Sequence, residues 1–373
     1  MNQPLPRWAD LLLLPAINLA VALLAAGVMV ALVGQSPLDV LVVLVRGAFG
    51  TERGLSYTLY YATTFVFTGL AVAVAFHGGL FNIGGEGQAI VGGLGTGMAA
   101  LWWSASLPAW AMLPLMLLAG ALFGMLWAAV PAVLQAYRGS HVVITTIMFN
   151  FLASSLLVYL LVNHLKVPGK MAVESAAFGA SAKLPAMHAL LAGMGLQWPA
   201  SPLNASVFLA LFAALGVYLL LWHTRVGYAL RATGASPGAA AYAGIHPRRQ
   251  VVLAMGVSGA LAGMVAMNEL AGVSGRLILE YAGGAGFTGI AVALMGRNHP
   301  GGIVAASVLF GALFQGGAEL SFDVPGFTRD MVVMLQGFIV LFSGAMAYVL
   351  APAVQRALAA IERASAAQGV ARG

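Results

Sequence analysis

The chain has 373 residues, of which 61% are hydrophobic and 8% are charged, and its mean hydropathy is +0.93. Soluble domains carry roughly a quarter of charged residues, so this composition excludes an ordinary soluble protein and indicates an all-α, polytopic membrane protein. The formal net charge is +6, but the basic residues are spread over many loops, which favours contact with anionic membrane lipids and argues against nucleic acid as a partner.

Apolar stretches long enough to cross a bilayer, about 18 residues or more, follow one another along the whole chain. We count about ten, at residues 11–33, 56–76, 80–103, 109–136, 141–163, 205–223, 249–270, 284–296, 302–320 and 331–351. The first is too long for the core of a cleaved secretory signal and is interpreted as a retained span. Residues 1–373 are therefore expected to form a single transmembrane domain.

The distribution of Lys and Arg predicts the orientation, because short cytoplasmic loops carry an excess of both. A cytoplasmic N-terminus followed by ten spans places most of the basic residues inside, with both termini in the cytoplasm. In this topology residues 166–202 form an extracytoplasmic loop with one short surface helix, residues 224–248 form a cytoplasmic loop, and residues 352–373 form a cytoplasmic tail.

A glycine-rich stretch, GLFNIGGEGQAIVGGLGTG, places Asn82, Glu86 and Gln88 within an expected span. A strongly polar side chain in hydrocarbon costs about 2.5 to 3.5 kcal/mol or more, so these three are expected to face protein or water. Gly84 and Gly85 allow the backbone to leave helical geometry, and Glu86 then lies in the first turn of a resumed helix, where the helix dipole favours an anion. Two interpretations stay open: a broken helix that lines a solute pathway, and a packing surface.

A second glycine-interrupted stretch, YAGGAGFTGIAVALMGRNHPGG from Tyr281 to Gly302, loosely matches the first. Transporters with two pseudo-symmetric halves place broken helices at a midplane site, so the matched pair points to a pathway. Within the first stretch, Gly93 and Gly97 form a GxxxG pair that is expected to admit another helix. Three aromatic residues are either core or lipid-facing groups or platforms for a planar substrate: Phe81, Phe287 and Phe314.

Other polar groups within the spans are few. Thr146 and Asn150 lie one helical turn apart, with Thr145 adjacent, so they line one side of a span. They are interpreted either as hydrogen-bonding contacts between helices or as pore-lining groups. Glu269, near the outer end of its span, is expected to pair with Arg276 or to reach the interface.

The cytoplasmic loop HTRVGYALRATGASPGAAAYAGIHPRR carries signals for a helix of about two turns. Ser236 is a suitable N-cap for a helix that begins at Pro237, Gly244 closes it, and Pro247 prevents its continuation. So short a helix cannot cross a membrane. Its alanine-rich surface suits a groove on a partner protein, and the alternative is an ordinary basic loop with an incidental helical turn.

Several kinds of chemistry are excluded. The three lysines, Lys166, Lys170 and Lys183, are followed by Val, Met and Leu, so no GxxxxGK[ST] phosphate loop exists. The sequence has no cysteine, no HExxH and no cluster of histidines and carboxylates at ligand spacing, so neither a metal site nor a bound cofactor is expected.

Four ordered stretches, GLFNIGGEGQAIVGG, SHVVITTIMFN, TRVGYALRATGASPGAAAYAGI and GFTGIAVALMGRNHPGGI, resemble the permease subunits of bacterial ABC importers in the ribose and branched-chain amino acid permease superfamily. The NIGGEGQ form favours its nucleoside, or simple-sugar, branch. The resemblance spans about residues 40–350. It implies an inner-membrane permease, not an enzyme, that moves nucleosides, of purine type, by alternating access. It also implies a partner ATPase that binds ATP and Mg²⁺, a second, paralogous permease, and an extracytoplasmic binding protein.

Combined with the polar pattern, this resemblance assigns two sets of residues. The solute path is expected to involve Phe81, Asn82, Gly84, Gly85, Glu86, Gln88, Thr145, Thr146, Asn150, Phe287 and Thr288. Coupling to the ATPase is expected to involve Arg231, Gly234, Ser236, Pro237, Ala240, Tyr242 and Gly244. One departure is Val142, which stands where members of the family often carry Glu.

Three alternatives remain open at this point. A permease for a pentose or related sugar fits the same motifs. A proton-coupled secondary transporter would use Glu86 or Glu269 as its protonation site. A membrane scaffold without solute flux would leave the glycine breaks without a function.

Overall fold

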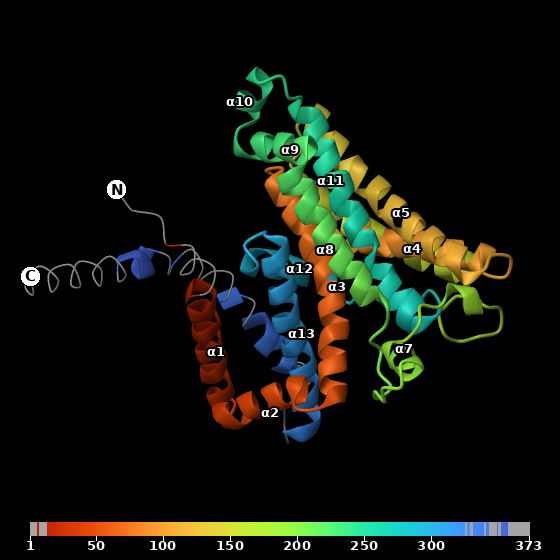
Figure 1. The fold of residues 1–373 in the computed structure, drawn as a ribbon, viewed down its shortest axis with the longest axis vertical. Coiled ribbons are helices and arrows are strands. Elements are labelled where there is room, and N and C mark those ends of the chain that lie inside the picture. Colours follow the sequence, from red (N-terminus) through yellow and green to blue (C-terminus); the bar gives the residue numbers. More distant parts are fainter. Residues whose placement is uncertain are drawn as a thin grey trace, which may run out of the picture. The chain divides into compact units, whose positions relative to one another are not determined.

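The computed structural model describes residues 6, 13–324, 327–328, 331–338, 341–342, 349 and 352–356, and these residues are predominantly helical (Figure 1). Extended pairing among them is limited to three isolated β-bridges, so the all-α prediction is confirmed. Most of the expected cytoplasmic tail, residues 357–373, lies outside the described residues, as does the start of the first expected span.

The elements are α1 (Leu14–Leu32), α2 (Pro37–Phe49), α3 (Glu52–His77), α4 (Gly85–Trp103), α5 (Ala109–Arg138), α6 (Val142–Leu160), η2 (Leu161–Leu165), η3 (Ala180–Ala182), α7 (Met187–Gly193), α8 (Ser206–His223), α9 (Arg225–Ala235), α10 (Pro237–Tyr242), α11 (Pro247–Gly263), η4 (Met267–Ser274), α12 (Ala285–Met295) and α13 (Pro300–Asp323).

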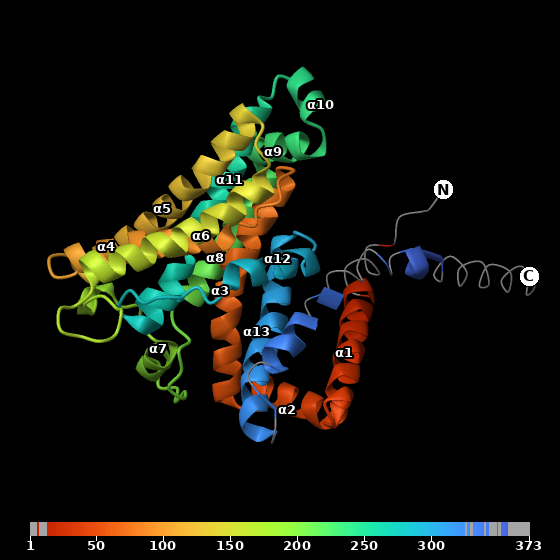
Figure 2. The same cartoon turned by 180° about the vertical axis from the view of Figure 1, so that it is seen from behind.

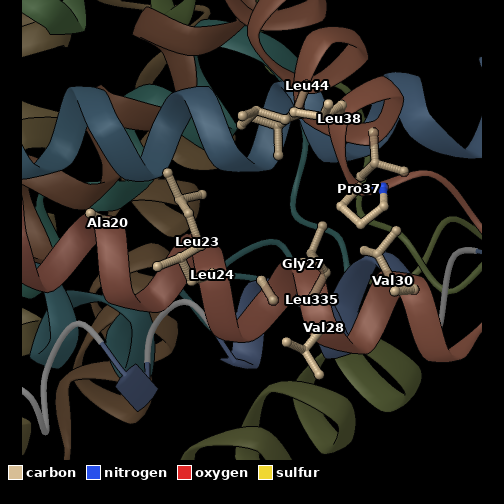
Figure 3. A pocket seen from close by; sticks show the side chains of 14 residues that line it. Ala20, Leu23, Leu24, Gly27, Val28, Val30, Pro37, Leu38, Leu44 and Leu335 are labelled. Atoms are coloured by element: carbon tan, nitrogen blue, oxygen red, sulfur yellow. The ribbon is translucent and has the colours of Figure 1, made fainter.

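The chain divides into two compact units, one of residues 1–44 with 317–373 and the other of residues 45–316. The first unit contains a pocket between α1, the start of α2 and Leu335 (Figure 3). Its lining side chains are Ala, Leu, Val and Pro, with one glycine. Such a pocket offers no hydrogen-bonding side chain to a polar solute.

Six helices in the described part of the chain are long and apolar enough to cross a membrane. They are α3, α5, α6 continued by η2, α8, α11 continued by η4, and α13. The expected spans at 80–103 and 284–296 have a different form. The first is a non-helical stretch followed by the 19-residue α4, and the second is α12, which has 11 residues where a span needs about 20.

Helix α3 is the centre of the second unit and packs against α8, α11 and α12. Of its most apolar 18-residue window, 78% is buried, compared with 33% for α5 and 28% for α8. Some of its hydroxyl side chains bond within the helix: Ser56 donates to the carbonyl of Glu52, and Thr63 to that of Leu59, both at 2.8 Å. A span that is polar in sequence is thus satisfied in part by its own carbonyls.

Helices α4, α5 and α11 pack at backbone distance. A Cβ placed on Gly92 would lie 2.3 Å from the Cα of Gly263, which leaves no room for any side chain between α4 and α11. The expectation that Gly93 and Gly97 admit a helix was wrong, because a Cβ at these positions would meet the Tyr281 hydroxyl and the Leu277 side chain. Small residues at neighbouring positions made the sequence ambiguous about which glycines face a helix.

The loop of residues 166–202 folds back onto the segment that follows η4. Isolated bridges pair Lys166 with Ser175 and Glu174 with Ile278, and Arg276 forms an ion pair with Glu174 at 2.5 Å. The short surface helix expected here is α7. Figures 1 and 2 show α7 and its flanking loops towards the end of this unit opposite to α9 and α10.

Candidate translocation and coupling site

The break between α3 and α4 is a non-helical stretch of residues 78–84, in which Gly78, Leu80, Asn82 and Gly84 are buried. Gly79 has a positive φ of 74°, which turns the chain away from the end of α3. Leu80 and Asn82 are 7% and 1% exposed. A buried backbone must find hydrogen-bond partners, and this one finds them partly in neighbouring side chains.

Asn82 provides one of those backbone bonds and three further bonds to side chains. Its Nδ2 donates to Gln88 Oε1 and to Ser258 Oγ, each at 2.9 Å, and its Oδ1 accepts from the N–H of Gly84 at 2.9 Å and from Gln88 Nε2 at 3.2 Å. The hydroxyl of Ser258, on α11, donates a hydrogen bond to the carbonyl of Ala71 on α3. The two amides therefore lock the bend, and their polar atoms bind the protein itself.

Asn150 on α6 fixes the bend from the other side. Its Nδ2 donates to the carbonyl of Ile83 at 2.9 Å, and its Oδ1 accepts from the N–H of Gly87 at 2.8 Å. Thr146, one turn earlier, is fully buried and donates to the carbonyl of Val143 within α6. This face of α6 thus contacts α4, as the packing interpretation expects. Helix α6 begins at Val142 without a side-chain cap and without an acid in its first turn.

Glu86 joins the starts of two helices. It lies in the first turn of α4, as the sequence predicts, and its two carboxylate oxygens accept hydrogen bonds from the N–H groups of Gly284 at 2.9 Å and Gly286 at 2.8 Å. These two N–H groups lie at the N-terminus of α12. Each helix N-terminus is equivalent to roughly +0.5 charge, so one carboxylate balances the two. We call residues 84–88 with 284–288 the glycine junction.

The glycine junction requires glycine on its α12 side. Gly284 has a φ of 80°, which favours glycine, and a Cβ on Gly286 would lie 2.1 Å from the backbone nitrogen of Glu86. The two stretches that the sequence matched to each other are therefore in direct contact. Nothing in the sequence indicated that Glu86 would cap the second stretch as well as the first.

The remaining residues expected on the path are placed less centrally. Phe81 is half-buried and packs edge-on against Phe76, with ring centroids 6.0 Å apart. Phe287 is 49% exposed. Thr145 and Thr288 are half-buried and donate to carbonyls of their own helical turns.

The loop of residues 224–248, which was expected to be cytoplasmic, contains two helices where the sequence analysis predicted one. Helix α9 is capped by Thr224, whose Oγ1 accepts from the N–H of Gly227 at 3.0 Å. Leu230 is fully buried, and Arg231 donates from Nε to the carbonyl of Leu221 at 3.0 Å, which fastens α9 to the end of α8. The sequence did contain a signal for α9. Thr224 is a suitable N-cap, and Gly227 and Leu230 follow at helical spacing on the face that is buried.

Helix α10 is the predicted short helix. Ser236 Oγ accepts from the N–H of Ala239 at 3.3 Å, and Gly244 beyond the helix has a φ of 80°. Ala240 is 3% exposed, so it packs against its own chain and does not offer a surface to a partner. Tyr242 is 98% exposed and is the large side chain that α10 presents outward.

Gly234, near the end of α9, lies against the end of α3. A Cβ at this position would come within 2.2 Å of the carbonyl of His77 and 2.8 Å of the nitrogen of Gly79. Gly79 is the first turn of the buried stretch that leads to α4. The loop of residues 224–248 is therefore in backbone contact with the break that ends at the glycine junction.

The expectation that Glu269 pairs with Arg276 was wrong. Arg276 binds Glu174 on the loop of residues 166–202. Glu269 instead accepts hydrogen bonds from Tyr60 and Thr64 on α3. The π-helical form of η4 turns Glu269 towards α3, and a sequence does not reveal such a change of helical form.

Comparison with known proteins places the chain among transport proteins. A family model described as branched-chain amino acid transport system / permease component matches residues 54–344. The guanosine ABC transporter permease protein NupP of Bacillus subtilis is 34% identical over 91% of this chain and 95% of its own length. The glucose ABC transporter permease protein TsgB13 of Haloferax volcanii is 33% identical over 88% and 86%, and the nucleoside ABC transporter permease protein NupB of Lactococcus lactis is 29% identical over 88% and 90%. No solved structure matches the chain.

Proposed function

The chain belongs to the branched-chain amino acid transport system permease component family, and from that premise we propose that it is the membrane subunit of an ABC importer for nucleosides of purine type. Two of the relatives named above act on guanosine or nucleosides, and they cover nearly the whole chain. A purine nucleoside is uncharged, planar and rich in hydroxyls, which suits a bundle whose buried polar groups are amides and hydroxyls.

The mechanism that we propose is alternating access. The observation that carries it is the contact of Gly234 with His77 and Gly79, because it joins the cytoplasmic loop to the buried break. A partner ATPase, which holds ATP and Mg²⁺, docks on α10 and moves α9. That movement is passed to α4 and α12, whose starts share the carboxylate of Glu86.

The wider arrangement is part of the same proposal. Ten spans are proposed from the apolar stretches, both termini in the cytoplasm from the distribution of basic residues, and a location in the bacterial inner membrane from the family resemblance. Two pseudo-symmetric halves follow from the matched glycine stretches. A paralogous second permease completes the pathway, and an extracytoplasmic binding protein delivers the solute on the side of residues 166–202.

A permease for a sugar is the second candidate, and the similarity to a glucose permease protein favours it. A proton-coupled transporter is the third, with Glu86 or Glu269 as the proton carrier. The three candidates differ in solute and in energy source.

Uptake measurements separate them. Labelled guanosine, uridine, ribose and glucose are offered to cells that lack this gene and to the same cells after it is restored. We expect guanosine uptake to be lost and regained. Loss of sugar uptake alone would replace the nucleoside by a sugar, and loss of uptake on collapse of the proton gradient, with ATP held constant, would replace the ABC mechanism.

A further inference from the structure

Glu269 is a carboxylate inside a membrane-spanning helix, in the stretch formed by α11 and η4. Intramembrane ionisable groups are rare, and they mark substrate or ion pathways more often than structural contacts. The two salt bridges found among the described residues both involve Glu174. The basic residue nearest in sequence, Arg276, is taken up by one of them.

Hydrogen-bond donors surround this carboxylate. Tyr60 donates from its hydroxyl to Oε2, and Thr64, one turn further along α3, donates to Oε1 at 2.5 Å. Asn268 Nδ2 lies 3.4 Å from Oε1. An ionised carboxylate has about four acceptor positions, so Oε2 keeps one position open beside the bond from Tyr60.

Asn268 and Glu269 are adjacent in the π-helical η4, and both contact the same surface of α3. Adjacent residues of an α-helix point about 100° apart, and π-helical turns occur frequently at functional sites. Asn268 donates to Thr64 Oγ1 at 2.7 Å, while its own Oδ1 accepts from Asn204 at 3.0 Å and from Ser206 at 2.8 Å. The carboxylate is thus held in place by a satisfied polar network.

The residues of this polar network differ in how far they are buried. Asn268, Thr64, Asn204 and Ser206 are at most 4% exposed, whereas Tyr60 and Glu269 are half-buried. Tyr60 and Glu269 are therefore the members of the network that reach its accessible side. Tyr60 lies eight residues into α3, roughly 12 Å along the helix from its start. It is therefore near the N-terminal end of α3, whereas α9 contacts the C-terminal end.

Aromatic rings continue this accessible side. The ring of Tyr60 is 5.2 Å from that of Tyr61, and Tyr61 is 5.8 Å from Phe314 on α13. Tyr61 and Phe314 are half-buried, while Phe65, 4.9 Å from Phe314, is buried behind them. Phe314 was a candidate platform for a planar substrate, and it is now placed in a row of rings that begins at the carboxylate's own partner.

We propose that this group is a solute-binding site, in which Glu269 accepts a hydrogen bond from a ribosyl hydroxyl and the rings of Tyr60, Tyr61 and Phe314 receive the planar base. The assignment rests on the proposed uptake of nucleosides. A carboxylate is the acceptor that proteins use for ribose hydroxyls in dinucleotide sites, and aromatic rings stack on any base. A neutral solute that leaves water here exchanges its hydrogen bonds with water for one to a charged acceptor.

The test compares guanosine with 2′-deoxyguanosine. The kcat/KM for uptake of each is measured with the complete transporter carrying the wild-type chain or Glu269→Gln. The binding protein is the same in both, so its contribution cancels when the ribo-to-deoxy ratio is compared between variants. A hydrogen bond to a charged acceptor corresponds to about a tenfold effect, so we expect the ratio to fall about tenfold in Glu269→Gln.

Two further variants sharpen the test. Glu52→Gln makes the same change at an exposed carboxylate of α3, and its ratio is expected to equal that of the wild type. Tyr60→Phe keeps the ring and frees Oε2 for the solute, so its ratio is expected to be maintained or to rise. If Glu269→Gln does not transport, binding of both nucleosides to the purified complex without the binding protein gives the same ratio.

The outcomes are distinct. An unchanged ratio in Glu269→Gln, with guanosine uptake by the wild type intact, overturns this site and leaves the proposed function standing. Absence of guanosine uptake by the wild type overturns the proposed function and this inference with it.

Discussion

The carboxylate of Glu86 on α4 accepts a hydrogen bond from the backbone N–H of Gly286 on α12, which lies 200 residues further along the chain. A second bond, from Gly284, uses the other oxygen. A single side chain thereby connects the starts of two helices that the sequence places in separate halves. Four predictions follow from this junction and from the loop that is linked to it.

Removing the carboxylate should weaken the junction. Glu86→Ala leaves the N–H groups of Gly284 and Gly286 without their acceptor, and each unsatisfied buried donor costs about 1 to 3 kcal/mol. We expect a lower thermal unfolding temperature in detergent and a loss of uptake. Glu52→Ala, at an exposed carboxylate, is the control and should leave both unchanged. An unfolding temperature equal to that of the wild type would show that the two bonds do not stabilise the chain.

Adding one methyl group at the contact should separate the two helix starts. In Gly286→Ala the new Cβ would lie 2.1 Å from the nitrogen of Glu86, so the backbone must move. We expect reduced accumulation in the membrane and no measurable uptake. Gly216→Ala makes the same change in α8, where nothing lies within 4 Å, and should be neutral or slightly stabilising. Normal uptake by Gly286→Ala would contradict this close approach.

The exposed ring on α10 should be needed for binding of the ATPase. Tyr242 is 98% exposed, so Tyr242→Ala removes a large contact surface without disturbing the interior of the chain. We expect co-purification of the ATPase to decrease while the thermal unfolding temperature stays the same. Met194→Ala removes an exposed apolar side chain next to α7 and should retain the ATPase. Undiminished co-purification of the ATPase with Tyr242→Ala would rule out this face of α10 as the docking surface.

The contact at Gly234 should transmit movement without contributing to docking. Gly234→Ala places a methyl group against the carbonyl of His77, and α9 must shift away from the end of α3. We expect the ATPase still to co-purify and to hydrolyse ATP, while uptake is lost. Gly216→Ala, in α8 with nothing within 4 Å, is the control substitution and should preserve uptake. If Gly234→Ala transports normally, α9 does not act through this contact.

The sequence predicted the local signals well. Gly84 and Gly85 marked the start of α4, and Ser236, Pro237 and Gly244 marked α10, because caps and breaks are determined by a few adjacent residues. Burial of Asn82 and Gln88 followed from the cost of polar groups in hydrocarbon.

Contacts between segments that are far apart in the chain could not be predicted from such local signals. Glu86 reaches α12 across 198 to 200 residues, and no local pattern encodes that distance. Glu269 was expected to pair with Arg276, which is close in sequence and opposite in charge, or to reach the interface, whereas its carboxylate accepts hydrogen bonds from Tyr60 and Thr64 on α3. Ala240 was expected on a surface because its neighbours are small and exposed, yet the short helix turns it inward.

The internal hydroxyl bonds of α3 also bear on how this chain is made. Its neighbours α11 and α12 begin at Pro247 and Ala285, so at ribosomal rates of about 5 to 20 residues per second α3 is synthesised roughly 10 seconds or more before either of them. During that interval its hydroxyls have no partner helix, and lipid offers them no hydrogen bond. Because Ser56 and Thr63 donate to carbonyls one turn back, these two hydroxyls are satisfied before the partner helices are made, whereas Tyr60 and Thr64 gain their acceptor only when η4 arrives.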